Sequence, residues 1–83
     1  MTEYMVKLKI TNAGTYSVPI NNRVMGVYST VAVKVGWDFN GETGEFTPAG
    51  VQIWEPREPF APGKTSKLII TATAATDVLI RME

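Results

Sequence analysis

The sequence contains neither cysteine nor histidine in its 83 residues. Without cysteine, the chain can form no disulfide framework and no thiolate zinc site. Without histidine, it lacks the commonest general base, a common metal ligand and the side chain whose charge changes near neutral pH. Both absences argue against catalysis and against a transition-metal centre.

An excess of charge of either sign is also missing. Eight Lys and Arg residues balance eight Asp and Glu residues, and the basic ones are scattered rather than gathered into the stripe that binds nucleic acid. Apolar runs reach only a few residues, far short of the roughly 20 that span a membrane. The first residues, MTEYMVKLKIT, show neither the apolar segment nor the cleavage site of a signal peptide. We therefore expect no nucleic-acid partner, no membrane partner and no signal peptide. The chain is expected to be made in the cytosol and either kept or assembled there into something larger.

The longest regular pattern that is present covers residues 23–39, RVMGVYSTVAVKVGWDF. From Val27 to Trp37 its odd positions read V, S, V, V, V and W, which is the period of two that is typical of a half-buried strand. No helix would place these alternate valines on one face. We predict a long central strand against which the other strands pair. A bend is expected at Gly26 or Gly36, because glycine within a strand often marks a bulge.

Five shorter segments show the same alternation and are predicted to be strands. They are residues 3–11, 15–20, 51–55, 64–73 and 78–82. Pro19 cannot donate a ladder hydrogen bond, so the strand that contains it is expected at an edge. Residues 71–76, TATAAT, are expected to be extended because a helix of six residues would be marginal.

These elements predict an all-β fold without helices. A chain of this length forms one domain, residues 1–83. Six to seven strands with tight turns bury their apolar faces as an antiparallel β-sandwich or a small Greek-key barrel.

Some apolar residues fall on the side of their strand that is opposite the predicted core side. They are Met5, Met25, Trp54, Ile69 and Leu79. Either the protein covers both faces of its sheet or a partner covers one of them. Because a chain this short buries a small core, we expect a homo-oligomer, either a dimer or a trimer.

The acidic segment 38–45, DFNGETGE, offers the oxygen ligands that calcium prefers. It lacks the calcium-loop spacing, in which Asp or Asn at positions 1, 3 and 5 precede the glycine. It also contains Asn40-Gly41, the strongest two-residue hairpin signal in the chain. A solvated hairpin without bound metal is the favoured interpretation, and a calcium site is the alternative.

Catalysis finds little support among the remaining residues. A pair of carboxylates could serve glycoside hydrolysis, but so short a β chain leaves little material for a deep cleft. The candidates are Asp38, Glu42, Glu45, Glu55 and Glu58. A serine nucleophile with a lysine base would need a spacing such as Ser-x-x-Lys, whereas Ser66 and Lys67 are adjacent. We expect no enzyme, no catalytic residue and no cofactor.

The aromatic residues could either form a binding surface or fill the core. The five considered are Tyr16, Tyr28, Trp37, Trp54 and Phe60. They could form a sugar-stacking platform or a protein-binding hot spot, although most aromatic residues of a small sandwich fill its core. Trp54 is predicted to face away from Ile53, as an exposed anchor beside the proline-rich loop 55–63. Phe60 in that loop is predicted to close one end of the core.

Three segments carry a resemblance to a known class of protein: GTYSVP at 14–19, PGKTSKLIITATAA at 62–75 and VLIRM at 78–82. In these the chain resembles the small all-β structural proteins of tailed-bacteriophage virions, particularly capsid decoration or cement proteins. The resemblance implies a non-enzymatic protein of the virion that sits on the outside of the capsid and bridges coat subunits as a dimer or trimer.

Contacts with partners are expected from two regions of the chain. The residues are Tyr4 and Met5 in the first strand, and Trp54, Arg57 and Phe60 around the proline-rich loop. Two alternatives stay open. One is a carbohydrate-binding β-sandwich module that uses Trp37, Trp54 and residues 38–40, and the other is a tail or adaptor component of a phage.

Overall fold

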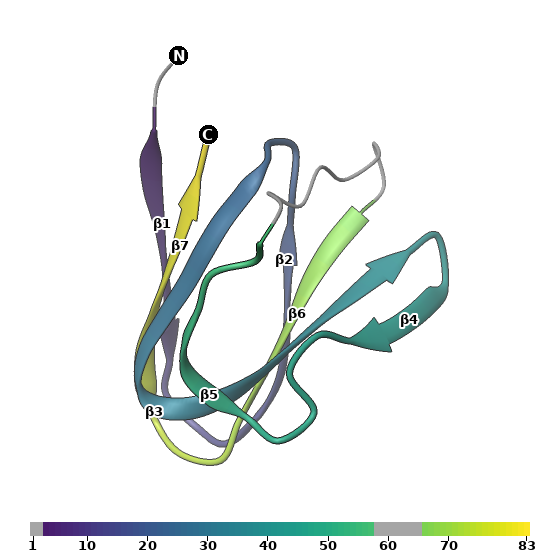
Figure 1. Ribbon diagram of the computed structural model, residues 1–83. Helices are drawn as coiled ribbons and strands as arrows, with labels where there is room; N and C mark the ends of the chain where they lie inside the picture. The colour runs from purple at the N-terminus through teal and green to yellow at the C-terminus, as the bar shows by residue number, and fades with distance from the viewer. Residues whose placement is uncertain (1–2, 58–65) are drawn as a thin grey trace.

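The computed structural model describes residues 3–57 and 66–83, which form seven antiparallel strands and, within these ranges, no helix. The strands are β1 (Tyr4–Ile10), β2 (Gly14–Pro19), β3 (Val24–Phe39), β4 (Glu42–Glu45), β5 (Val51–Trp54), β6 (Ser66–Ala72) and β7 (Thr76–Met82). They belong to one sheet that curls into a half-barrel (Figure 1). The prediction of an all-β fold with six to seven strands is confirmed.

The central strand is β3, as the sequence predicted, with 16 residues and four neighbouring strands. Residues 24–29 pair with β7 on one side, and Val27 and Tyr28 pair with β5 on the other. Residues 33–39 pair with β6 on one side; on the other, Val33 pairs with β5 and residues 36–39 pair with β4. The bend of β3 lies between Tyr28 and Val33, where its register with β5 shifts. Gly26 marks a bulge against β7 instead.

The neighbouring strands fold over together with β3. Ile10 lies opposite Thr76, and Gly14 lies opposite Ala72. Three residues lie between Ile10 and Gly14, and three lie between Ala72 and Thr76. The pairing of β1 with β7 and that of β2 with β6 therefore continue in the same register across the fold. The sheet therefore has a first half, made of β1, β7, residues 24–29 of β3 and β5. Its second half is made of β2, β6, residues 33–39 of β3 and β4.

The core lies between the two halves and is built from alternate residues of the strands. On β6 these are Leu68, Ile70 and Ala72, and on β7 they include Val78 and Ile80, all within 3% of complete burial. The remaining buried hydrophobic residues are Ile10, Val18, Ile20, Val24, Val27, Val33, Val35 and Met82. Burial of each large aliphatic side chain contributes about 1.5–3 kcal/mol. The inward sets predicted for the last two strands are confirmed.

Two local predictions about turns and edges are also confirmed. Asn40 and Gly41 form the hairpin between β3 and β4 with φ values of 58° and 94°. The Asp38 carboxylate accepts a 2.9 Å hydrogen bond from the Gly41 N–H and closes the turn. Pro19 lies on β2, which ends the sheet order and has β6 as its neighbour.

One predicted orientation is wrong. Trp54 faces the core side, where it packs against the buried cluster, while Ile53 is 65% exposed. The reason is the pairing of β5 with β3: Trp54 lies opposite Val27, a core residue, and directly opposed residues of paired strands share a face. Phe60 and most of the proline-rich loop lie outside the described residues.

No helix in the described ranges is long and apolar enough to cross a lipid bilayer.

Candidate functional site

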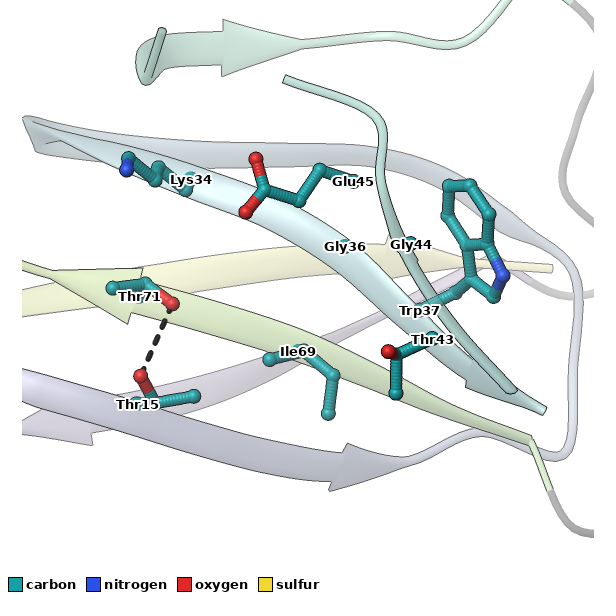
Figure 2. Close-up of a pocket in the computed structure, with 9 residues that line it drawn as sticks. All are labelled: Thr15, Lys34, Gly36, Trp37, Thr43, Gly44, Glu45, Ile69 and Thr71. Carbon is teal, nitrogen blue, oxygen red and sulfur yellow. Dashed lines mark hydrogen bonds between the residues drawn. The ribbon is translucent and has the colours of Figure 1, made fainter. Parts of the chain in front are cut away.

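Grooves indent the outer surface of both halves of the folded sheet in the described part of the chain, and one on each half is considered for binding. The groove on the second half has a volume of about 510 Å³. Its lining residues are Thr15, Lys34, Gly36, Trp37, Thr43, Gly44, Glu45, Ile69 and Thr71 (Figure 2). Most are polar, and the hydroxyls of Thr15 and Thr71 hydrogen-bond to each other at 3.2 Å.

The groove on the first half, of about 440 Å³, is the more apolar of the two. It is lined by Lys7, Tyr28, Ser29, Thr30, Gln52, Ile53, Asp77 and Leu79. It belongs to what we call the outer face, the solvent-facing side of β1, β7, residues 24–29 of β3, and β5. The Lys7 and Asp77 side chains form an ion pair at 3.3 Å at its rim.

A row of four residues crosses the outer face, one from each strand. Lys7 lies opposite Leu79, Leu79 opposite Tyr28, and Tyr28 opposite Ile53. Ile53 is 65% exposed and Leu79 37%, and Met5, two residues along β1 from Lys7, is 53% exposed. Large apolar side chains are thus neighbours on a surface that faces solvent.

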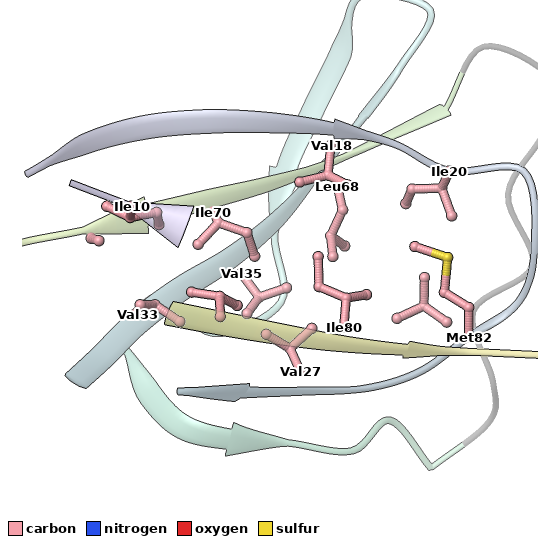
Figure 3. Close-up of a cluster of buried hydrophobic side chains, with 13 residues drawn as sticks. Ile10, Val18, Ile20, Val27, Val33, Val35, Leu68, Ile70, Ile80 and Met82 are labelled. Carbon is pink, nitrogen blue, oxygen red and sulfur yellow. The ribbon is translucent and has the colours of Figure 1, made fainter. Parts of the chain in front are cut away.

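The inner side of the same strands is already occupied by the core. Figure 3 shows Ile80 pointing from β7 toward Leu68 on β6, and both side chains are completely buried. Successive residues of a strand point to opposite faces of the sheet. Because Ile80 is buried on the inner side, Leu79 lies on the outer face. Within the described residues, Leu79 and Ile53 remain exposed on the outer face.

The ring of Tyr28 is fixed over Gly26 on the outer face. A Cβ atom built on Gly26 would lie 2.8 Å from the ring carbon Cζ, a separation that real Cβ atoms do not show. The glycine therefore provides the room in which the ring lies along its own strand. A ring held in this way is a rigid apolar surface that loses little conformational freedom on binding.

Tyr28 also takes part in a polar network at one end of the outer face. Its hydroxyl donates a 2.6 Å hydrogen bond to Glu55 Oε2. Arg81 lies 3.6 Å from the same carboxylate oxygen and 3.7 Å from the Glu3 carboxylate. Burial raises the pKa of the Tyr28 phenol, and the hydrogen bond to Glu55 raises it further.

The residues expected to contact partners fall into different surroundings. Met5 lies on the outer face as an exposed side chain, and Arg57 is also exposed. Tyr4, 40% exposed, points to the other side of β1 and donates a 2.7 Å hydrogen bond to Asn22 Oδ1. Trp54 is half-buried on the core side, and Phe60 lies outside the described residues.

Of the aromatic residues considered for sugar stacking, Trp37 and Trp54 belong to a cluster of rings at the β4–β5 side of the sheet. Phe46 lies between the two tryptophans, with its ring centre 4.7 Å from that of Trp37 and 4.7 Å from that of Trp54. The Trp54 ring is stacked on Phe46 at an interplanar angle of 25°. The two tryptophans therefore contact Phe46 rather than forming an open platform together.

Sequence reasoning missed Tyr28 and Ile53 as outer-face residues. The apolar alternation of residues 51–54 was visible, but it fits either orientation of a four-residue strand. Metal binding gains no support: among the described residues, no three carboxylates are close enough to share one ion.

Comparison with known proteins identifies no relative of this chain. No protein-family model matches the sequence, and neither a curated protein nor a solved structure is significantly similar to it.

Proposed function

We propose that this chain is a non-enzymatic structural protein of a tailed-phage virion, a capsid decoration protein that self-associates and bridges coat subunits. The observation that supports this best is the outer face. Met5, Ile53 and Leu79 are exposed together there on a sheet whose inner side is filled. Contiguous apolar surface of this kind is typical of a protein–protein interface.

The proposal also agrees with the size of the chain. A domain of 83 residues buries a modest share of its surface, so an interface adds apolar burial that the isolated chain lacks. In a shell the same contact is repeated many times, and weak single contacts then act together. Rim charges such as Lys7 and Asp77 would set the orientation of the partner.

Binding to capsids tests the proposal. Purified protein is mixed with shells of the phage whose genome encodes it, prepared without decoration protein, and the shells are pelleted. We expect the native protein to pellet in a fixed ratio to coat protein and to raise the temperature at which the shells open. Protein that stays in solution beside intact shells would overturn the decoration role.

A matched pair of variants links binding to the outer face. Leu79→Ser removes an exposed apolar side chain from the row and is expected to reduce both self-association and pelleting. Thr73→Ser changes an exposed residue of the turn between β6 and β7, outside the outer face, and is expected to bind like the native protein. Equal pelleting of the two variants would show that another surface binds the shell.

A carbohydrate-binding function is the second candidate, and the groove of the second half favours it. Sugar ligands need hydroxyl and charged partners beside an apolar surface. The groove offers the side chains of Thr15, Thr71 and Lys34 at one end, and those of Glu45 and Trp37 further along (Figure 2). Saturable quenching of tryptophan fluorescence by a glycan, lost in Lys34→Ala, would favour this function over the structural one.

A further inference from the structure

We propose that the free edge of β1 binds an extended segment of another protein as an added antiparallel strand, in which acidic residues alternate with apolar ones. The inference goes beyond the proposed function, because it concerns an edge of the sheet rather than the outer face and names its partner by chemistry alone. Domains with an open edge recognise such a segment by main-chain hydrogen bonds and by the side chains at alternate positions.

The edge of β1 is long and regular. β1 ends the sheet order, and within the described residues its only strand neighbour is β7 (Figure 1). Seven consecutive pairs, from Tyr4–Met82 to Ile10–Thr76, join the two strands without a shift of register. Alternate residues of an antiparallel strand direct their N–H and C=O groups to opposite sides. The groups of β1 that point away from β7 are therefore a template for another strand.

The other open edges of the described sheet are less suited to such pairing. β2, at the opposite end of the order, begins at Gly14 and ends at Pro19, which cannot donate a ladder hydrogen bond. β4 and β5 have only four residues each. β1 contains neither glycine nor proline in its seven residues. It is therefore the edge that best accepts an added strand.

The core side of β1 favours apolar residues in the added strand. Val6 and Leu8 pack against the buried cluster but are only half-buried, whereas Ile10 is 2% exposed. Within the described residues, no strand lies beyond β1 to cover them. Directly opposed residues of paired strands share a face. Apolar residues opposite Val6 and Leu8 would thus bury surface that the isolated chain leaves exposed.

The solvent side of β1 favours acidic residues in the added strand. Lys7 and Lys9 lie there beside one carboxylate, that of Asp77, which pairs with Lys7 at 3.3 Å. Lys9 lies opposite Asp77 in the register but makes no ion pair in the described part of the chain. This end of the edge therefore carries a surplus positive charge. Opposite charges across a strand pair are stabilising, and like charges are destabilising.

The two sides together define the segment that fits. All strand pairs of the described sheet are antiparallel, and we assign the same direction to the added strand. It then places an acidic residue opposite Lys9, an apolar one opposite Leu8, an acidic one opposite Lys7 and an apolar one opposite Val6. Its central sequence is Glu-Val-Glu-Val or an equivalent alternation.

A synthetic peptide tests the proposal with the native chain. The peptide Thr-Glu-Val-Glu-Val-Thr is blocked at both ends and carries a fluorophore. Fluorescence anisotropy should show saturable binding, and hydrogen exchange measured by NMR should become slower at alternate amides of β1. A peptide of the same composition in the order Thr-Glu-Glu-Val-Val-Thr should bind at least about tenfold more weakly. Equal binding of the two peptides, or no binding of the first up to about 1 mM, would overturn the proposal.

Charge reversal in the chain tests the register. Lys9→Glu should weaken binding of the alternating peptide by at least about tenfold, and a peptide with lysine in place of its first glutamate should restore it. Lys34→Glu makes the same change at an exposed residue of the second half and should bind like the native chain. Circular dichroism confirms that both variants are folded. Equal weakening in the two variants would mean attraction by net charge alone and would contradict the proposal.

Hydrogen exchange without peptide tests whether a second copy of the chain occupies the edge instead. We expect exchange at the alternate amides of β1 to be independent of protein concentration, even where the outer face self-associates. Protection of these amides that grows with concentration would overturn the proposed partner in favour of a second copy. Because these measurements report on the edge of β1 alone, their failure is distinguishable from failure of the proposed function.

Discussion

The Tyr28 hydroxyl donates a 2.6 Å hydrogen bond to Glu55 Oε2 and so ties the middle strand of the sheet to the end of β5. The same carboxylate oxygen lies 3.6 Å from Arg81 on β7. One side chain thus links three adjacent strands on their solvent side. The contact fixes the Tyr28 ring at the centre of the outer face.

The first prediction concerns the fit between Gly26 and Tyr28. Gly26→Ala should destabilise the fold by about 1–3 kcal/mol, because the added methyl group overlaps the Tyr28 ring and forces it to move. In a Tyr28→Ala background the same change should cost much less. Urea unfolding of the four proteins gives the coupling energy. Additive effects would mean that the ring does not lie over Gly26.

The ionisation of Tyr28 should be visible in a pH titration. Burial and the hydrogen bond to Glu55 raise its pKa above the ordinary value of 10.0. At a pH between the unfolded-state and folded-state pKa values, the folded chain keeps the Tyr28 proton and the unfolded chain has lost it. The contribution of Tyr28 to stability is therefore complete below pH ~10 and declines as the pH rises through the folded-state pKa. Phenolate absorbance should show a late transition that Tyr28→Phe abolishes and Tyr4→Phe retains. If Tyr4→Phe abolishes the late transition and Tyr28→Phe retains it, the transition does not belong to Tyr28.

Thr47 is predicted to hold the turn before β5 against β3. Its buried hydroxyl oxygen accepts a 2.7 Å hydrogen bond from the Val35 N–H. Thr47→Val keeps the shape but leaves that N–H without an acceptor, at a cost of about 1–3 kcal/mol in the free energy of unfolding. Thr47→Ser keeps the acceptor and should lose less. Thermal denaturation compares the two, and an equal loss would show that the methyl group matters more than the hydrogen bond.

The β3–β4 hairpin offers a test of backbone strain alone. Gly41 has a φ of 94°, and no atom lies within 4 Å of a Cβ built there. Gly41→Ala should therefore destabilise the fold by about 1–2 kcal/mol through its backbone conformation. Gly41→Asn should cost less, because asparagine adopts positive φ more readily. Equal unfolding free energies for glycine and alanine at this position would contradict the turn geometry.

The parts of the fold that the sequence predicted are those with local signals. The alternation around Val33 and Val35 predicted the central strand, and Asn40-Gly41 predicted the hairpin, because both patterns act between close neighbours in the chain. The bend of β3 between Tyr28 and Val33 has no such signal. It follows from the way that β6 and β7 succeed each other along its edge.

The candidate site depended more on contacts that are distant in sequence. Residues 51–54 are apolar or amphipathic at every position but one, so their pattern did not decide which side faces the core. Pairing of Trp54 with Val27 decides it and turns Ile53 outward. The hydrogen bond between Tyr28 and Glu55 joins residues 27 positions apart and was likewise invisible in the sequence.

The most direct test of self-association through the outer face is the solution mass of the native chain, measured by light scattering over a concentration series. We predict a mass that rises with concentration to about two or three times the 9.1 kDa of one chain, and a return to the single-chain mass in Ile53→Ser with unchanged circular dichroism. A native chain that keeps the single-chain mass at every concentration would contradict the account.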